Sequence, residues 1–210
     1  MRNVFINAGH FANDPGVVVG TAIERDIVMR VRDGVKALLP SAYYLPDDLN
    51  LRDSIAWVNQ KSDPGDFAVD IHLNAHADTS VRGTEAYYTE TPRYAEVFAN
   101  KVSQHLQVPN RGPKHDSLTY VGSLGWLHQL KCPSVVVELC YLSNEADRAK
   151  ILGTGGIEAA AQGIATAIET IFPEEDVIQK KISLLTRLIQ LYQQLIELLK
   201  GREENKSAKQ

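Results

Sequence analysis

The segment that decides the fold is Phe67-Ala68-Val69-Asp70-Ile71-His72-Leu73-Asn74-Ala75-His76. It begins with apolar residues and then alternates apolar and polar ones, which predicts one buried strand that ends in polar side chains. Because side chains alternate along a strand, His72, Asn74 and His76 are expected to point to one side. Two imidazoles and an amide are costly to bury without partners, so this strand end is a candidate site. The competing interpretation is a histidine that only packs in the core.

The bulk composition limits the class of protein. The chain has 210 residues, 44% hydrophobic and 23% charged, which suits one α/β domain with an appendage. A net charge of −4 without a long basic run argues against nucleic acid as a partner. No apolar run is long enough for a transmembrane segment. The N-terminus enters a strand-like segment at once, so we expect no signal peptide and synthesis in the cytoplasm.

The two cysteines, Cys132 and Cys140, flank a segment that is typical of a strand. An extended segment of that length holds its ends roughly 25 Å apart, far beyond the reach of a disulfide. Two reduced, buried thiols are therefore predicted.

Strand-like and helix-like segments alternate along residues 1–173, which we interpret as one domain. Strands are predicted at residues 2–7, 42–45, 67–76, 83–88 and 134–139. Helices are predicted at residues 21–39, 51–60, 92–106, 124–130 and 157–171, with a short one after residue 144. Residues 107–122 have the composition of a loop. This alternation predicts a three-layer α/β fold with a twisted, mostly parallel sheet flanked by helices.

In such sheets functional residues collect beyond the carboxyl ends of the strands. His10 follows the first predicted strand, His72 ends the central one and Glu138 ends a later one. Glu24 lies near the start of the first helix, close to the same edge. Glu24 also fits the third position of a capping box that begins at Thr21, which is the alternative interpretation.

Two histidines and one carboxylate are the ligands of many catalytic zinc ions, which keep one position open. His10, Glu24 and His72 fit this set and predict one zinc ion per chain, although manganese or iron also accepts such ligands. A further carboxylate that does not bind the metal can act as general base on water at the metal. Glu138 fits that role. A carboxylate directly after three valines is expected to be buried, and buried carboxylates are rare unless they are paired or take part in function.

Several short motifs occur in order along residues 3–172. They are Asn7-Ala8-Gly9-His10, Asp14-Pro15-Gly16, Ile23-Glu24-Arg25-Asp26, Asp70-Ile71-His72-Leu73-Asn74-Ala75, Gly83-Thr84-Glu85-Ala86-Tyr87-Tyr88, Asn110-Arg111-Gly112 and Val136-Val137-Glu138-Leu139-Cys140-Tyr141-Leu142-Ser143-Asn144. Together they resemble the zinc-dependent N-acetylmuramoyl-L-alanine amidases of the amidase-3 type, which are peptidoglycan hydrolases of bacteria and phage endolysins.

This resemblance implies that His10, Glu24 and His72 bind zinc and that Glu138 is the catalytic carboxylate. The implied reaction is hydrolysis of the amide between N-acetylmuramic acid and L-alanine, with peptidoglycan as the partner. Without a signal peptide, the protein would act on the cell wall after release, as an endolysin does. Asn74 and His76 are candidates for contact with substrate, and a solvent-exposed loop histidine is the alternative for His76.

The chain departs from the family pattern at three places, one of which is Leu45-Pro46-Asp47-Asp48, where a Thr-Arg pair often follows the second strand. Asn7 stands where the family usually has an aspartate, and Phe11-Ala12 replace glycines, which would narrow the mouth of the site. No inserted helix of the kind that occludes autoinhibited relatives is evident. These departures bear on substrate preference more than on the chemistry.

Residues 174–200 show a heptad pattern that predicts an amphipathic helix, followed by a flexible tail at 201–210. The seam consists of Ile178, Ile182, Leu185, Ile189, Tyr192, Ile196 and Leu199, and a second apolar stripe of Leu184, Leu188, Leu191, Leu195 and Leu198. So broad an apolar face favours a homo-oligomer, with docking on the chain's own domain or contact with a membrane surface as alternatives.

Two other functions compete with a peptidoglycan amidase. One is a catalytically idle module that binds peptidoglycan or regulates a partner. The other is a zinc amidase or peptidase that acts on a different substrate.

Overall fold

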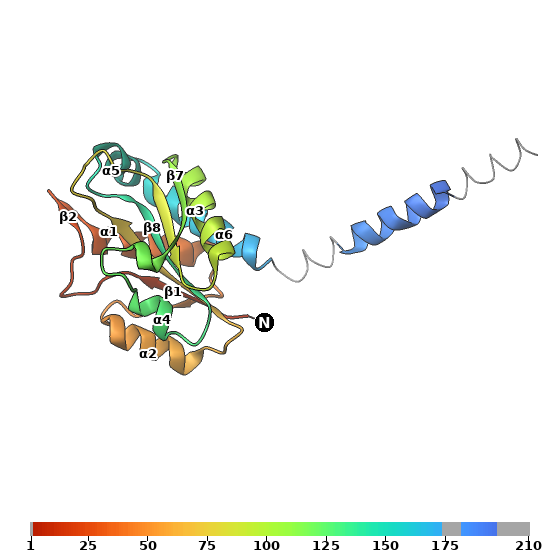
Figure 1. Ribbon diagram of the computed structural model, residues 1–210, viewed down its shortest axis with the longest axis horizontal. Coiled ribbons are helices and arrows are strands. Elements are labelled where there is room, and N and C mark those ends of the chain that lie inside the picture. The colour runs from red at the N-terminus through yellow and green to blue at the C-terminus, as the bar shows by residue number, and fades with distance from the viewer. Residues whose placement is uncertain (1, 174–181, 197–210) are drawn as a thin grey trace, which may run out of the picture. The chain divides into compact units, whose positions relative to one another are not determined.

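The computed structural model describes residues 2–173 and 182–196. The chain divides after Ile171 into two units, and each is described by itself. The first unit contains a sheet covered by helices, and the second contains a helix over residues 182–196 (Figure 1).

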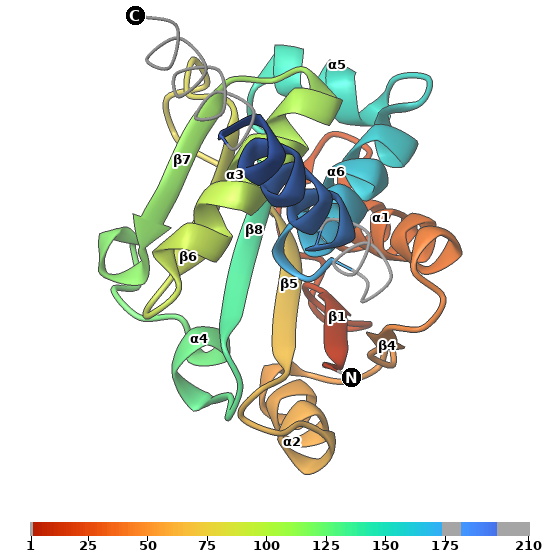
Figure 2. The same cartoon turned by 90° about the vertical axis from the view of Figure 1, so that its right-hand side faces the viewer.

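The first unit is built on a six-stranded sheet in the order β4-β1-β5-β8-β6-β7 (Figure 2). The strands are β1 (Val4–Ala8), β4 (Tyr43–Tyr44), β5 (Phe67–Asn74), β6 (Thr84–Tyr88), β7 (Asn110–His115) and β8 (Ser134–Tyr141). Neighbouring strands are parallel except for β6 and β8, which are antiparallel. The predicted α/β fold with a mostly parallel sheet is confirmed.

Helices cover both faces of this sheet, which is why its central strands are apolar on both sides. The helices α1 (Glu24–Leu38), α3 (Pro92–Leu106) and α6 (Gly156–Ile171) pack together on one face. On the other face, α2 (Leu51–Lys61) and α4 (Gly125–Gln129) cover a core that includes Phe5, Val58, Trp126 and Val136. The remaining elements are α5 (Glu145–Leu152), the 3₁₀ helix Asp116–Leu118 and the hairpin of β2 (Val18–Val19) and β3 (Ala22–Ile23).

Local capping explains where two helices begin. The side chain of Asn50 accepts a hydrogen bond from the amide of Asp53 at the start of α2. The side chain of Asn144 likewise accepts from the amide of Asp147 at the start of α5. Both are N-cap contacts that satisfy an otherwise unpaired amide.

The predicted start of the first helix is wrong. Helix α1 begins at Glu24 with Ile23 as its N-cap, without a side-chain cap, while residues 22–23 pair in β3. Thr21 therefore caps nothing, and Glu24 is not the glutamate of a capping box. Its carboxylate is held instead by amides outside the helix, as described below.

The predicted loop at residues 107–122 is also wrong in part, because it contains strand β7. This strand lies at the edge of the sheet, where Pro113 is tolerated. Gly112 adopts a φ of +77° beside an irregularity in the pairing with β6. Glycine and proline are depleted in strands, so the composition concealed an edge strand.

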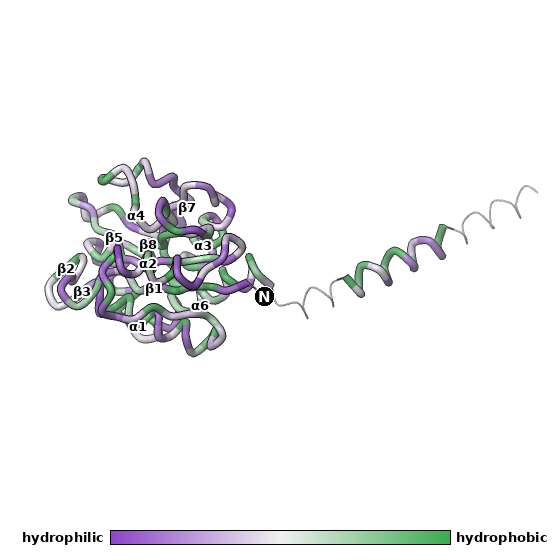
Figure 3. Tube along the Cα trace, turned by 90° about the horizontal axis from the view of Figure 1, so that it is seen from below, coloured by the Kyte–Doolittle hydropathy of each residue, from purple (hydrophilic) through white to green (hydrophobic). Residues whose placement is uncertain are grey.

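The second unit is described over residues 182–196, which are helical. Hydrophobic and hydrophilic residues alternate around this helix (Figure 3). Its large apolar side chains are about half exposed or more, with Leu184 at 68% and Tyr192 at 63%. The rest of the predicted helix (174–181 and 197–200) and the predicted tail (201–210) lie outside the described residues. Among the described helices, none has the length and apolar character needed to cross a membrane.

Candidate metal centre and active site

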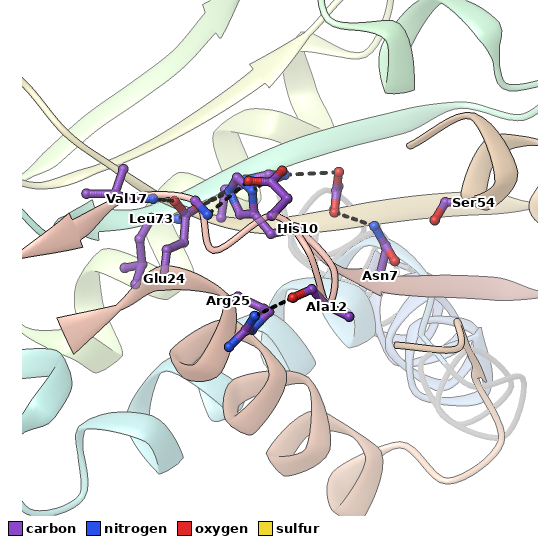
Figure 4. Close-up of polar contacts among 12 residues, drawn as sticks. Asn7, His10, Ala12, Val17, Glu24, Arg25, Ser54 and Leu73 are labelled. Atoms are coloured by element: carbon purple, nitrogen blue, oxygen red, sulfur yellow. Dashed lines mark hydrogen bonds and ion pairs between the residues drawn. The ribbon is translucent and has the colours of Figure 1, made fainter. Parts of the chain in front are cut away.

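Three side chains from separate segments converge at the carboxyl edge of the sheet. His10 lies in the loop after β1, Glu24 is the first residue of α1 and His72 lies in β5. One ligand atom from each lies within 4.8 Å of the others. His10 Nε2 is 3.0 Å from Glu24 Oε1, and both residues are labelled in Figure 4. His72 Nδ1 is 3.1 Å from the same oxygen. The predicted ligand residues therefore share one site.

The carboxylate of Glu24 is fixed by backbone amides on both sides. Val17 N–H donates to Oε2 and Leu73 N–H donates to Oε1, each at 2.8 Å. Burial alone would raise the pKa of Glu24, but hydrogen bonds from His10 and His72 hold it well below its usual range. Glu24 is therefore an ionised carboxylate whose orientation is fixed.

The second ring nitrogen of each histidine contacts another carboxylate. His10 Nδ1 is 2.8 Å from Asp14 Oδ2, and His72 Nε2 is 3.1 Å from Asp70 Oδ2. Asn7 Nδ2 donates to the other oxygen of Asp70 at 2.8 Å. Such outer carboxylates fix the tautomer and ring orientation of metal-binding histidines. Sequence reasoning assigned no role to Asp14 or Asp70, although Asp70 lies two residues before His72 on the same strand.

The electrostatics of both histidines follow from these contacts. Burial works to lower the pKa of His10, but Glu24 and Asp14 raise it. Burial likewise opposes protonation of His72, while Asp70 and Glu24 raise its pKa well above the usual value. The surroundings thus favour a positive charge, which a proton or a metal cation can supply.

Two glycines make room for the ligand atoms. Gly16 has a φ of +64°, and a Cβ there would lie 2.5 Å from His10 Nε2 and 2.6 Å from Glu24 Oε2. A Cβ at Gly9 would lie 2.4 Å from the ring of His72. Both distances are too short for a side chain, so glycine is required. Together with the donor set, this cradle fits a cation that takes two imidazoles and a carboxylate.

Glu138 lies beside His72, because the two are register partners on β8 and β5. Its Oε2 atom is buried without a hydrogen-bond partner among the described residues. Burial raises the pKa of Glu138 to about 8, and the charges of Glu24 and Glu85 act in the same direction against that of His72. A carboxyl group with a pKa near neutrality suits general acid–base catalysis.

Glu138, His10 and His72 line one cavity of about 310 Å³. Its wall also contains the apolar side chains of Phe11, Leu49, Leu51, Leu124, Trp126 and Val136. Phe11, which replaces a glycine of the family pattern, thus forms part of the wall. Its loop is held by Arg25, whose Nη1 donates to Ala12 O at 2.9 Å.

Asn74 and His76, the candidates for contact with substrate, do not line this cavity. Asn74 Nδ2 lies 3.5 Å from Glu85 Oε2. The exposed His76 accepts a hydrogen bond from the amide of Asp78 through Nδ1 at 3.0 Å. Their proposed role in substrate contact stays a prediction.

The contact between Asp70 and His72 leads to a prediction. Replacing Asp70 with asparagine removes the carboxylate that orients His72, and we expect zinc affinity to fall by about 10–100-fold. Competition with a chromophoric chelator measures this affinity. Asp63→Asn, at an exposed position before β5, is the matched control and should bind zinc normally. Equal affinity in the two variants would contradict a role for Asp70.

The chain is similar to known cell-wall enzymes. Residues 4–170 match the amidase-3 family, described as N-acetylmuramoyl-L-alanine amidase. Over 174 residues the chain is 27% identical to the N-acetylmuramoyl-L-alanine amidase LytC of Bacillus subtilis, covering 78% of this chain and 34% of that protein. It is 25% identical to the endolysin of Bacillus phage SPP1, covering 80% of this chain and 65% of the endolysin. The chain thus spans about a third of the length of LytC.

Solved structures show the same fold. The catalytic domain of CwlV, an N-acetylmuramoyl-L-alanine amidase from Bacillus (Paenibacillus) polymyxa var. colistinus, superposes with a TM-score of 0.70 at 26% identity, covering 81% of this chain and 98% of that domain. An N-acetylmuramoyl-L-alanine amidase from Clostridium difficile 630 gives a TM-score of 0.73 at 20% identity, covering 83% and 98%.

Proposed function

The chain belongs to the amidase-3 family of N-acetylmuramoyl-L-alanine amidases, and from this membership we propose that it hydrolyses the amide between N-acetylmuramic acid and L-alanine in peptidoglycan. The observation that carries the proposal is the convergence of His10, Glu24 and His72 at one point, beside a cavity that His10 and His72 line together with Glu138. Similarity to a phage endolysin supports action on the cell wall after release.

We propose that His10, Glu24 and His72 hold one zinc ion. A zinc ion bound there would make a water molecule more acidic and would polarise the substrate carbonyl. Asp14 and Asp70 keep the second nitrogens of the histidines engaged, so that His10 Nε2 and His72 Nδ1 face Glu24. Manganese or iron in place of zinc would be found by metal analysis.

Glu138 carries the proton transfers in this proposal. Its unpartnered Oε2 accepts a proton from the attacking water while the water oxygen bonds to the amide carbon. The same carboxyl then gives the proton to the nitrogen of L-alanine as the carbon–nitrogen bond breaks. The apolar wall around it limits competing water and strengthens these interactions.

Product analysis of digested peptidoglycan tests this function. The expected products are an intact glycan strand and stem peptides with a free amino group on L-alanine, identified by mass spectrometry and amine labelling. A different new terminus would indicate a zinc hydrolase with another substrate. Binding to peptidoglycan without any release would indicate the idle binding module.

We further propose that the helix at residues 182–196 joins copies of this chain. Its described apolar side chains are exposed, and burying them between copies is favourable because of the hydrophobic effect. Light scattering of the full chain should give an oligomer, and Leu188→Glu with Leu195→Glu should give a monomer. Gln190→Glu is the control and should leave the oligomer intact. A monomeric full chain at micromolar concentration would rule this out, and flotation with lipid vesicles would then test the membrane alternative.

A further inference from the structure

A second buried carboxylate lies next to the proposed general base. Glu85 on β6 is the register partner of Glu138 on β8, and its side chain is fully buried. It accepts hydrogen bonds from Arg111 Nε, from Lys114 Nζ at 2.6 Å and from the hydroxyl of Tyr141 at 2.7 Å. The hydroxyl of Tyr87 donates to its other oxygen at 2.8 Å. The function proposed above assigns no role to this cluster.

The cluster carries more positive than negative charge. Burial would raise the pKa of Glu85, but the hydrogen bonds from Lys114, Tyr141 and Arg111 lower it to about 2, so its carboxylate is ionised. One carboxylate therefore faces two cations. Among the described residues, Arg111 and Lys114 form no ion pair with any other carboxylate. One cation is enough to neutralise Glu85, so the second gives the cluster a net positive charge.

The excess charge is accessible to solvent. The side chains of Arg111 and Lys114 are 35% and 26% exposed, whereas that of Glu85 is 0% exposed. A ligand that approaches this surface meets the cations and not the anion. The guanidinium of Arg111 also lies 5.5 Å from the centre of the Tyr141 ring, which restrains it further. The two cations are thus held in place before any ligand arrives.

The position of the cluster matches the length of a peptide substrate. Glu138 and Glu85 are register partners on the adjacent strands β8 and β6, so one strand spacing, roughly 5 Å, separates their backbones. The charged groups of Arg111 and Lys114 reach from β7 to the carboxylate of Glu85, which places them just beyond that spacing. An extended peptide advances about 3.3–3.6 Å per residue. A stem peptide whose first amide lies beside Glu138 therefore brings its second or third residue to Arg111 and Lys114.

We propose that Arg111 and Lys114, anchored by Glu85, bind a carboxylate of the stem peptide and make the enzyme selective for acidic stems. This proposal rests on the function proposed above. A guanidinium presents parallel donors that match a carboxylate, and a lysine ammonium adds a second charge. A carboxylate on the second residue of the stem peptide and the corresponding carboxamide have nearly the same shape and differ in charge, so the two forms are a matched pair of ligands.

The experiment compares two muramyl peptides that differ only in this carboxyl group, free in one and amidated in the other. We expect kcat/KM of the wild type to favour the free acid by about 10- to 100-fold, the range of a hydrogen bond to a charged group. Arg111→Gln and Lys114→Gln should each lose most of this preference through a higher KM for the acid, with hydrolysis of the amide retained. Arg111→Lys keeps the charge and should retain part of the preference. Arg30→Gln, an exposed position on α1, should behave as the wild type.

Calorimetric titration of the free stem peptides, acid and amide, into the same proteins provides a readout independent of catalysis. If the wild type binds the acid more tightly than the amide and Arg111→Gln does not, the subsite is supported. This holds even if the wild type hydrolyses neither substrate. Absence of hydrolysis would contradict the proposed amidase function and not the subsite. Equal affinity of the wild type for the two peptides would overturn the subsite. The subsite would also be overturned if every variant lost kcat/KM equally on both substrates. Arg111 and Lys114 would then only maintain the structure around Glu85.

Discussion

Replacing Glu138 with glutamine is expected to lower the rate of amide hydrolysis by roughly 10²–10⁴-fold, the usual contribution of a general acid–base group. The glutamine has the same shape but cannot accept the proton of the attacking water. Because Glu138 is not one of the three converging ligand residues, the metal content should be unchanged. Measurements of kcat and of metal per chain on the same samples separate these two effects. Glu169→Gln, at an exposed position on α6, is the control.

Glu138→Gln is expected to lower the rate of hydrolysis but to raise the stability of the metal-free protein at high pH. Without bound metal, the native state holds a proton on Glu138 up to a pH of about 8, whereas in the unfolded chain the carboxyl loses its proton near pH 4.5. A cation bound at the neighbouring histidines would favour the ionised carboxylate that the proposed base needs. As the pH rises between these values, the free energy of unfolding decreases. The unfolded chain loses the proton of Glu138 readily, whereas the native state must either keep the proton or bury a charged carboxylate. Metal-free Glu138→Gln should therefore melt at a higher temperature than the wild type at pH 9, with little difference at pH 4. Equal melting temperatures at pH 9 would show that the native pKa of Glu138 is not raised.

The second large effect is expected from Glu24→Gln, which should abolish both metal retention and hydrolysis. The amide lacks the negative charge that the two imidazoles and the amides of Val17 and Leu73 surround. The loss of affinity should exceed the roughly 10–100-fold expected when an outer partner such as Asp70 is replaced. Metal content after dialysis, measured by mass spectrometry, gives the result directly.

Chelation of the wild type is the companion experiment. Removal of the metal should stop hydrolysis, and addition of zinc should restore it in the wild type but not in Glu24→Gln. If Glu24→Gln kept both metal and activity, the prediction would be wrong, and Glu24 would have only a structural role at the start of α1.

Much of the fold could be predicted because hydrophobic patterns reflect burial. The continuous apolar run of β8 indicates a strand covered on both faces, and the periodic apolar residues of α1 indicate a helix that packs with one face on the sheet. Strand β7 was missed because it lies at an edge, where one side of the strand needs no partner and Pro113 is tolerated. The start of α1 was misplaced because Thr21 and Glu24 have the spacing of a capping box, and only the fold shows that Glu24 is held by residues of other segments.

The converging residues could be predicted from the rule that sites lie beyond the carboxyl ends of parallel strands, which brought His10, His72 and Glu138 together. The outer carboxylates were not predicted, because Asp14 and Asp70 lie near their histidines in sequence but only the folded structure shows which ring nitrogen each one contacts. Asn7 replaces an aspartate of the family pattern, and its register partner on β5, Asp70, supplies a carboxylate to His72 on that same strand. A charged residue inside the otherwise buried β5 was the signal that could have indicated this.

The antiparallel pairing of β6 with β8 bears on how such an enzyme can change over evolution. Because of the reversal, residues 75–83 join the end of β5 to the start of β6 along the edge that holds His72 and Glu138. Residues 75–80 of this connection are exposed, and exposed connections accept insertions readily. The connection that follows β6 leaves from the opposite edge. Insertions or deletions at 75–83 can therefore reshape the rim beside the reacting groups while the sheet that aligns them is inherited unchanged.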